Sequence, residues 1–85
     1  MGQLGAALER LSAALGLDPK LELAHLLSAE VFNDMGKHAE AVEHYRQADP
    51  LIRDVPGAMV RWSKTLRELG RPDEAIAVLE RLRRP

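Results

Sequence analysis

The sequence contains no cysteine and very few aromatic residues. The absence of cysteine excludes disulfides, thiolate chemistry and cysteine-based zinc sites. Aromatic residues make up 4% of the chain, and alanine and leucine dominate its 46% of apolar residues. Side chains of these two types lose little rotamer freedom in a helix. For a chain of 85 residues, this composition favours one small domain of closely packed helices.

The chain also lacks an excess of charge and a long apolar run. Its 12 basic and 13 acidic residues give a formal net charge of -1, which offers no broad attraction to nucleic acid or to an anionic membrane. No apolar run approaches the ~20 residues of a membrane span. No basic stretch precedes an apolar one, as it would in a signal peptide. We therefore expect a soluble, cytoplasmic protein that neither binds nucleic acid nor inserts into a membrane.

What the sequence does contain is an internal repeat. The string GKHAEAV at 36–42 returns as GRPDEAI at 70–76, so the period is the spacing from Gly36 to Gly70. The same spacing counted back from Gly36 leads to Gly2. Equivalent positions hold residues of similar size: Ala7, Ala41 and Ala75; Leu11, Tyr45 and Leu79; Ala24 and Ala58; Phe32 and Leu66; Met35 and Leu69.

Each copy of the repeat predicts two helices. Apolar residues recur at helical spacing from Glu22 to Met35, and Gly36 follows as a helix stop, because glycine enters the left-handed conformation at low cost. A return helix is expected from Ala39 to about Asp49. The second copy predicts helices over 56–69 and 72–83, and a return helix without its partner is expected over 3–15, about five helices in all.

This pattern resembles the tetratricopeptide repeat, a helix-turn-helix unit with a period of about 34 residues. The pattern asks for Trp, Leu-Gly, Tyr, Ala, Phe and Pro in that order. The first full copy places His25, Ser28-Ala29, Phe32, Ala41 and Tyr45 there, the second places Met59, Trp62-Ser63, Leu66, Ala75 and Leu79, and the leading half copy supplies Ala7, Leu11 and Pro19.

The resemblance covers essentially the whole chain and implies an all-α fold. Antiparallel hairpins would stack as a right-handed superhelix in a single domain, with a half repeat at 1–21 and full repeats at 22–55 and 56–85. The small residues Ala29, Ser63, Ala41 and Ala75 would let paired helices approach closely. Trp62 is expected in the core. Arg53 replaces the expected proline, which predicts a longer and less regular link between the full repeats.

In proteins that this chain resembles, the first helix of each hairpin lines a concave groove. An apolar floor with polar walls of both signs would suit an extended or helical peptide. Glu30 and Asp34 would repel a C-terminal carboxylate, so the carboxylate clamp of some family members is not expected. The groove positions are Leu23, Leu26, Glu30, Asn33 and Asp34 in the first copy, and Gly57, Val60, Lys64, Arg67 and Glu68 in the second.

Two alternative interpretations of these positions involve no ligand. Glu30 and Lys64 hold equivalent places on adjacent helices and could simply form a surface ion pair, which contributes at most ~1 kcal/mol. Leu23 and Leu26 could instead be covered by an upstream helix.

Catalytic, metal and cofactor sites are not expected. His25, His38 and His44 include no pair at the i, i+4 spacing of helical metal ligands. We expect His25 to pack in the core, His38 to lie in a turn and His44 on an outer face. The serines lie inside predicted helices without a neighbouring base. The basic residues Arg81, Arg83 and Arg84 are typical of a last helical turn, where they complement the helix dipole.

The sequence therefore favours a non-catalytic scaffold that binds a protein or peptide partner. One alternative is an accessory segment of a larger bacterial enzyme or of an assembly or secretion component. A second alternative is self-association into a homo-oligomer, because an unpaired first helix needs a neighbour. Its exposed face would consist of Leu4, Leu8, Leu11 and Leu15.

Overall fold

The computed structural model describes residues 2–18 and 20–83, with the side chains of 3–18 and 20–81. The described residues form helices and turns and no strand, so the predicted all-α class is confirmed. The helices are α1 (Gly2–Leu17), α2 (Glu22–Asp34), α3 (His38–Gln47), α4 (Asp49–Ile52), α5 (Pro56–Glu68) and α6 (Pro72–Arg83).

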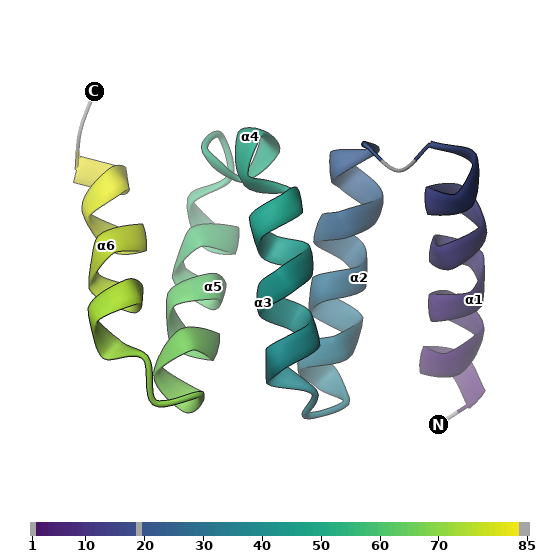
Figure 1. Ribbon diagram of the computed structural model, residues 1–85, viewed down its shortest axis with the longest axis horizontal. Helices are drawn as coiled ribbons and strands as arrows, with labels where there is room; N and C mark the ends of the chain where they lie inside the picture. Colours follow the sequence, from purple (N-terminus) through teal and green to yellow (C-terminus); the bar gives the residue numbers. More distant parts are fainter. Residues whose placement is uncertain (1, 19, 84–85) are drawn as a thin grey trace.

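The long helices stand side by side and alternate in direction (Figure 1). Helices α2 and α3 form one hairpin, α5 and α6 form the next, and α3 packs on α5 to join them. Helix α1 lies against α2 at the other end of the row. The molecule measures 35 × 25 × 16 Å. None of the helices in the described ranges is long and apolar enough to cross a membrane.

Two glycines end the first helix of each hairpin in the same way. Gly36 has φ 77° and Gly70 has φ 74°. After Gly36, the Lys37 N–H donates to the Phe32 carbonyl at 2.8 Å, and after Gly70 the Arg71 N–H donates to the Leu66 carbonyl at 2.9 Å. These bonds satisfy the last carbonyls of α2 and α5, as in a Schellman motif. The predicted glycine stops are therefore confirmed.

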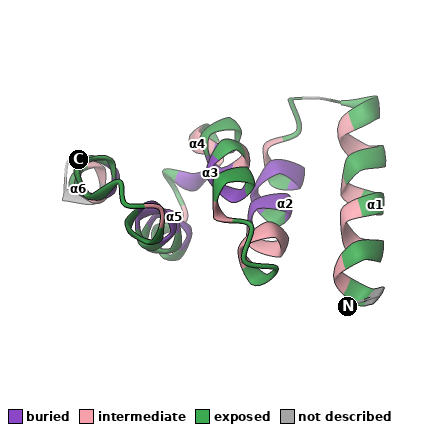
Figure 2. Cartoon of the chain, turned by 60° about the horizontal axis from the view of Figure 1, so that its bottom comes forward, coloured by how far each residue is buried: buried purple, intermediate pink, exposed green. Residues whose placement is uncertain are grey.

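The core lies within and between the two hairpins, where the buried residues of α2, α3 and α5 concentrate (Figure 2). Ala29, Ala41, Ser63 and Ala75 are all buried, as close helix packing requires. The Trp62 ring stacks on Tyr45 with centroids 6.1 Å apart and is 5% exposed. The prediction that Trp62 belongs to the core is confirmed.

The link between the hairpins is longer than the link between α1 and α2, as predicted, but it contains a short helix that was not predicted. Helix α3 ends at Gln47 instead of Asp49, and a four-residue helix, α4, follows it. Pro50 occupies the first turn of α4, where its missing N–H costs no hydrogen bond. Ile52 is fully buried and joins the core cluster. The link is thus a packed helical turn that contributes to the interface between hairpins.

Equivalent positions of the two hairpins differ in burial. Val42 is 1% exposed, but Ile76, its equivalent in the second hairpin, is 56% exposed. Val42 lies in the core cluster of the stack, whereas α6 is the last helix of the row. Helix α1 has no buried residue among those described. Its half-buried residues lie on the flank toward α2, and its other described residues are exposed (Figure 2).

Candidate functional site

The surface shared by α2 and α5 is held together by two polar contacts between the hairpins. Arg61 of α5 forms an ion pair with Glu30 of α2. Thr65 Oγ1 donates to Asn33 Oδ1 at 3.0 Å. Asn33 Oδ1 also lies 2.8 Å from His38 Nδ1, at the start of α3. These contacts bridge α2 and α5 through polar side chains.

Three cavities follow one another along this surface. The acidic pocket, about 310 Å³, is lined by Glu30, Asn33, Asp34, Tyr45 and Arg61. The middle pocket, about 370 Å³, is lined by Asn33, His38, Arg61, Lys64, Thr65 and Glu68. The outer pocket, about 440 Å³, is lined by Val60, Ser63, Lys64, Arg67, Glu68 and Leu79.

Neighbouring pockets share walls. Asn33 and Arg61 line both the acidic and the middle pocket. Lys64 and Glu68 line both the middle and the outer pocket. The three cavities therefore lie next to one another in a row. The predicted groove positions that line it are Glu30, Asn33, Asp34, Val60, Lys64, Arg67 and Glu68.

The remaining groove positions depart from the expectation. Leu26 is 7% exposed and belongs to the core, so it does not form an open apolar floor. Leu23 is 54% exposed and lines none of the three pockets. The alternative pairing of Glu30 with Lys64 is wrong, because Glu30 pairs with Arg61. Lys64 has no ion pair among the described side chains.

The Tyr45 hydroxyl is an unusual feature of the acidic pocket. The residue is fully buried, and the Arg61 guanidinium lies next to its hydroxyl. Burial raises the pKa of Tyr45, and the nearby Glu30 carboxylate adds to this effect, while the Arg61 guanidinium opposes it. The phenol is therefore neutral at physiological pH.

Two histidines meet inside the first hairpin. His25 Nδ1 and His44 Nδ1 lie 3.0 Å apart, and the His44 ring stacks on Phe32 at 5.4 Å. Burial lowers the pKa of His44, and the neighbouring His25 lowers it further, while Glu43 raises it. His25 is buried as expected, but the prediction that His44 lies on an outer face is wrong. His44 on α3 contacts His25 on α2. Residue spacing along one helix does not reveal this contact, because it joins two helices.

The structure therefore brings together a histidine pair that the sequence analysis missed. Among the side chains that the structure describes, no three His, Cys, Asp or Glu residues come together in a group that could hold a metal ion.

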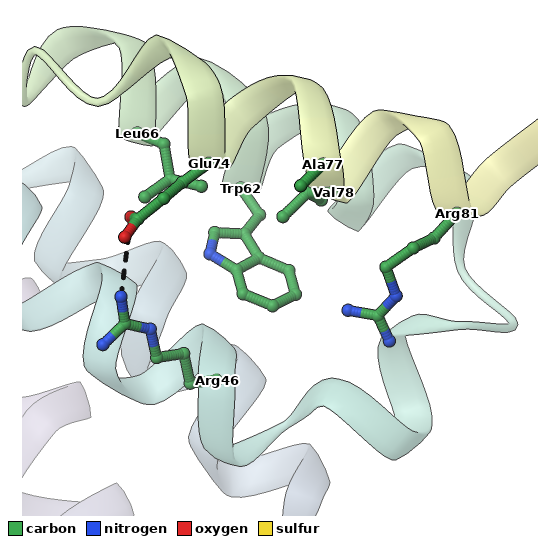
Figure 3. A pocket seen from close by; sticks show the side chains of 7 residues that line it. All are labelled: Arg46, Trp62, Leu66, Glu74, Ala77, Val78 and Arg81. Atoms are coloured by element: carbon green, nitrogen blue, oxygen red, sulfur yellow. Dashed lines mark ion pairs between the residues drawn. The ribbon is translucent and has the colours of Figure 1, made fainter.

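A fourth cavity, about 290 Å³, lies between α3, α5 and α6 (Figure 3). Its apolar walls are Trp62, Leu66, Ala77 and Val78. An ion pair of Arg46 with Glu74 at 3.5 Å closes one side, and Arg81 lies at the other, 6.0 Å from the indole centroid.

Two features of this cavity were not predicted. Trp62 Nε1 is buried and has no hydrogen-bond partner among the described residues. Arg81, expected to complement the end of a helix, also pairs with Asp49 of α4. The side chains of Arg83 and Arg84 lie outside the described residues.

Stacked hairpins with a polar row of pockets along their first helices define a helical-repeat scaffold. Residues 23–51 and residues 58–84 each match the tetratricopeptide repeat family. The chain belongs to this family, whose repeats generally mediate protein–protein interactions and are typically non-catalytic. The two matches follow α2 to α4 and α5 to α6. A search of curated proteins finds no match.

Proposed function

We propose that this chain is a non-catalytic interaction scaffold that binds a peptide, or an extended segment of a partner protein, along the row of pockets between α2 and α5. The observation that carries the proposal is the shared walls of the three pockets. A partner segment that lies across both hairpins can occupy all three without a rearrangement of the backbone. Preformed sites of this kind lower the ordering cost of binding.

The charges along the row favour a partner of mixed character. Asp34 and Glu68 are exposed and form no ion pair among the described residues, and the same holds for Lys64 and Arg67. Such side chains can pair with a ligand without first breaking an internal contact. Complementary charges at several points set the register and the specificity of a partner more than its affinity.

Peptide selection with mapping of the bound surface tests the proposal. Peptides from a random phage-displayed library are selected on the protein, synthesised, and titrated into the ¹⁵N-labelled chain. We expect amide shifts along α2 and α5, and a weaker affinity for Lys64→Ala than for the native chain. Lys20→Ala is the control, because Lys20 is exposed in the link between α1 and α2. Shifts confined to α1 or to the Trp62 cavity would contradict the proposal.

Self-association is a second candidate with a weaker basis. Four leucines of α1, Leu4, Leu8, Leu11 and Leu15, are half-buried, and α1 packs on α2, so part of the proposed contact surface is already used. Sedimentation of the isolated chain tests this candidate, and a monomer at all concentrations would reject it. An accessory role in a larger bacterial enzyme or assembly would use the same row of pockets, and a pull-down with the chain would identify such a partner.

A further inference from the structure

We propose that the exposed surface of α5 and α6 around the outer pocket binds a helix of a partner protein, and that this helix carries an acidic residue opposite Lys64. This inference goes beyond the proposed function, because the helix packs on the second hairpin alone and not along the row between α2 and α5. It follows from the equivalence of two pockets in the repeat, from the exposed apolar residues around the outer pocket, and from its charge.

The outer pocket repeats the acidic pocket of the first hairpin. Four of the five residues that line the acidic pocket have their equivalents, one repeat period later, among the residues that line the outer pocket. These pairs are Glu30 and Lys64, Asn33 and Arg67, Asp34 and Glu68, and Tyr45 and Leu79. The fifth wall of the acidic pocket is Arg61, which belongs to α5 of the next hairpin. Among the described residues, none takes the place of Arg61 at the outer pocket.

The first hairpin shows what covers a surface of this kind. Helix α5 packs on α3, next to which it stands in the row (Figure 1). Its Arg61 forms an ion pair with Glu30, and its Trp62 ring stacks on Tyr45. One helix therefore covers the acidic pocket with a charged residue and with the large apolar residue that follows it.

The equivalent apolar surface of the second hairpin is exposed. Val60 is 50% exposed, whereas Leu26, its equivalent in the first copy, is 7% exposed. Leu79 is half-buried, whereas Tyr45 is fully buried. Ile76 lies one helical turn before Leu79 on α6 and is also exposed. Covering these side chains removes apolar surface from water, which favours the binding of a helix with an apolar face.

The charge of the outer pocket is the reverse of that of the acidic pocket. Lys64 lies where the first copy has Glu30, and Arg67 follows it on α5. Neither cation has an ion pair among the described side chains, and Glu68 is the only acidic residue among those that line the pocket. Lysine and arginine donate hydrogen bonds and accept none. A covering helix therefore needs a carboxylate where α5 has Arg61.

A second copy of this chain does not supply that carboxylate. A copy stacked in the same register would place its α2 where α5 lies on the first hairpin. Leu27 is the equivalent of Arg61, so an apolar residue would face Lys64. In such a copy α2 is also packed on α1, which would have to move away. The charges therefore favour a partner helix in which an acidic residue precedes a large apolar one, as Arg61 precedes Trp62.

The test uses two stapled peptides. Both have the sequence of α5, with a hydrocarbon staple in place of the exposed residues 64 and 68, so that the helix is formed before binding. One retains Arg61 and the other carries Arg61→Glu. Each peptide is titrated into the ¹⁵N-labelled full chain. We expect the Arg61→Glu peptide to shift amides of α5 and α6 and to bind about fivefold more tightly than the Arg61 peptide, because attraction to Lys64 replaces repulsion.

A charge reversal in the chain locates the contact. Lys64→Glu gives the second hairpin the carboxylate that the first has at Glu30, so the order of the two affinities should reverse. Lys20→Glu, at an exposed lysine in the link between α1 and α2, makes the same change in net charge and should leave the order unchanged. Circular dichroism checks that both variants are folded. Equal affinities of the two peptides for the native chain, failure of both to bind, or no reversal in Lys64→Glu would overturn the inference.

The outcome for this inference is separate from that for the proposed function. A segment bound in the row shifts amides of α2, whereas a helix on the second hairpin shifts those of α5 and α6. If the phage-selected peptides shift α2 and α5 while the stapled peptides bind equally, the scaffold stands and the acidic-helix assignment is wrong. If the stapled peptides behave as expected while no selected peptide perturbs α2, the proposed function alone fails. A concentration-dependent dimer of the native chain with the same α5 and α6 shifts would contradict the inference, because a second copy would then be the occupant.

Discussion

The stacking of the two hairpins predicts unequal effects of truncation at equivalent positions. Val42 and Ile76 occupy the same place in the repeat, but Val42 is 1% exposed and Ile76 is 56% exposed. Val42→Ala removes two buried methyl groups, at about 0.8 kcal/mol each, and leaves a cavity in the core. The better helix propensity of alanine offsets about 0.5 kcal/mol. We expect a net loss of about 2 kcal/mol in the free energy of unfolding.

Ile76→Ala removes a larger side chain, but more than half of it is already in contact with water. The propensity gain offsets most of the remaining loss, and the expected change is within about 0.5 kcal/mol. For a domain of this size, the Val42 variant should melt about 10 °C lower than the native chain and the Ile76 variant within about 3 °C of it.

Urea denaturation followed by tryptophan fluorescence measures both variants. Trp62 is the only tryptophan and is buried, so its emission reports the loss of the packed hairpins. The slope of the transition should be the same for both variants, since the surface exposed on unfolding hardly changes. Equal losses of stability in the two variants would refute the view that Val42 is packed in the core and Ile76 is not.

Three further substitutions test single features. His44 has a lowered pKa in the folded state, so the unfolded chain binds more protons below pH 6.5 and stability falls as pH decreases through that value. In melts between pH 7 and pH 5, His44→Asn should flatten this decline, and an unchanged pH profile would remove the histidine pair as its cause. Gly36→Ala should cost about 1 kcal/mol, because φ is 77° there, whereas Gly5→Ala inside α1 should stabilise by about 0.5–1 kcal/mol. Thermal melts that give the two glycine variants the same sign would contradict this reasoning.

The features that repeat along the sequence were predictable from it. The glycine stops at 36 and 70 and the helix starts at Pro56 and Pro72 lie where the sequence predicts them. Each depends on local chemistry, namely the conformational freedom of glycine and the fixed φ of proline. A pattern that returns at a fixed period also identifies the hairpin, because each repeat is one structural unit.

Contacts that occur in only one copy of the repeat, or between different repeat positions, were not predictable in this way. Ile52 is buried, but the equivalent position of the leading half copy holds Asp18, so the period carries no apolar signal there. Glu30 was compared with its equivalent, Lys64, yet its ionic partner is Arg61, one helical turn away on α5. An alignment of the repeats matches residues at the same repeat position, whereas an ion pair forms between residues that are close in space.

Helix α1 gives the molecule an uneven stability along its length. It packs on α2 and has no buried side chain among its described residues. In a linear stack, each unit is held by its own stability and by its nearest neighbours. Helix α1 is held mainly by α2, while α3 is held by α2, α4 and α5. Amides of α1 should therefore exchange with solvent through local opening, and those of α3 only when both hairpins unfold together.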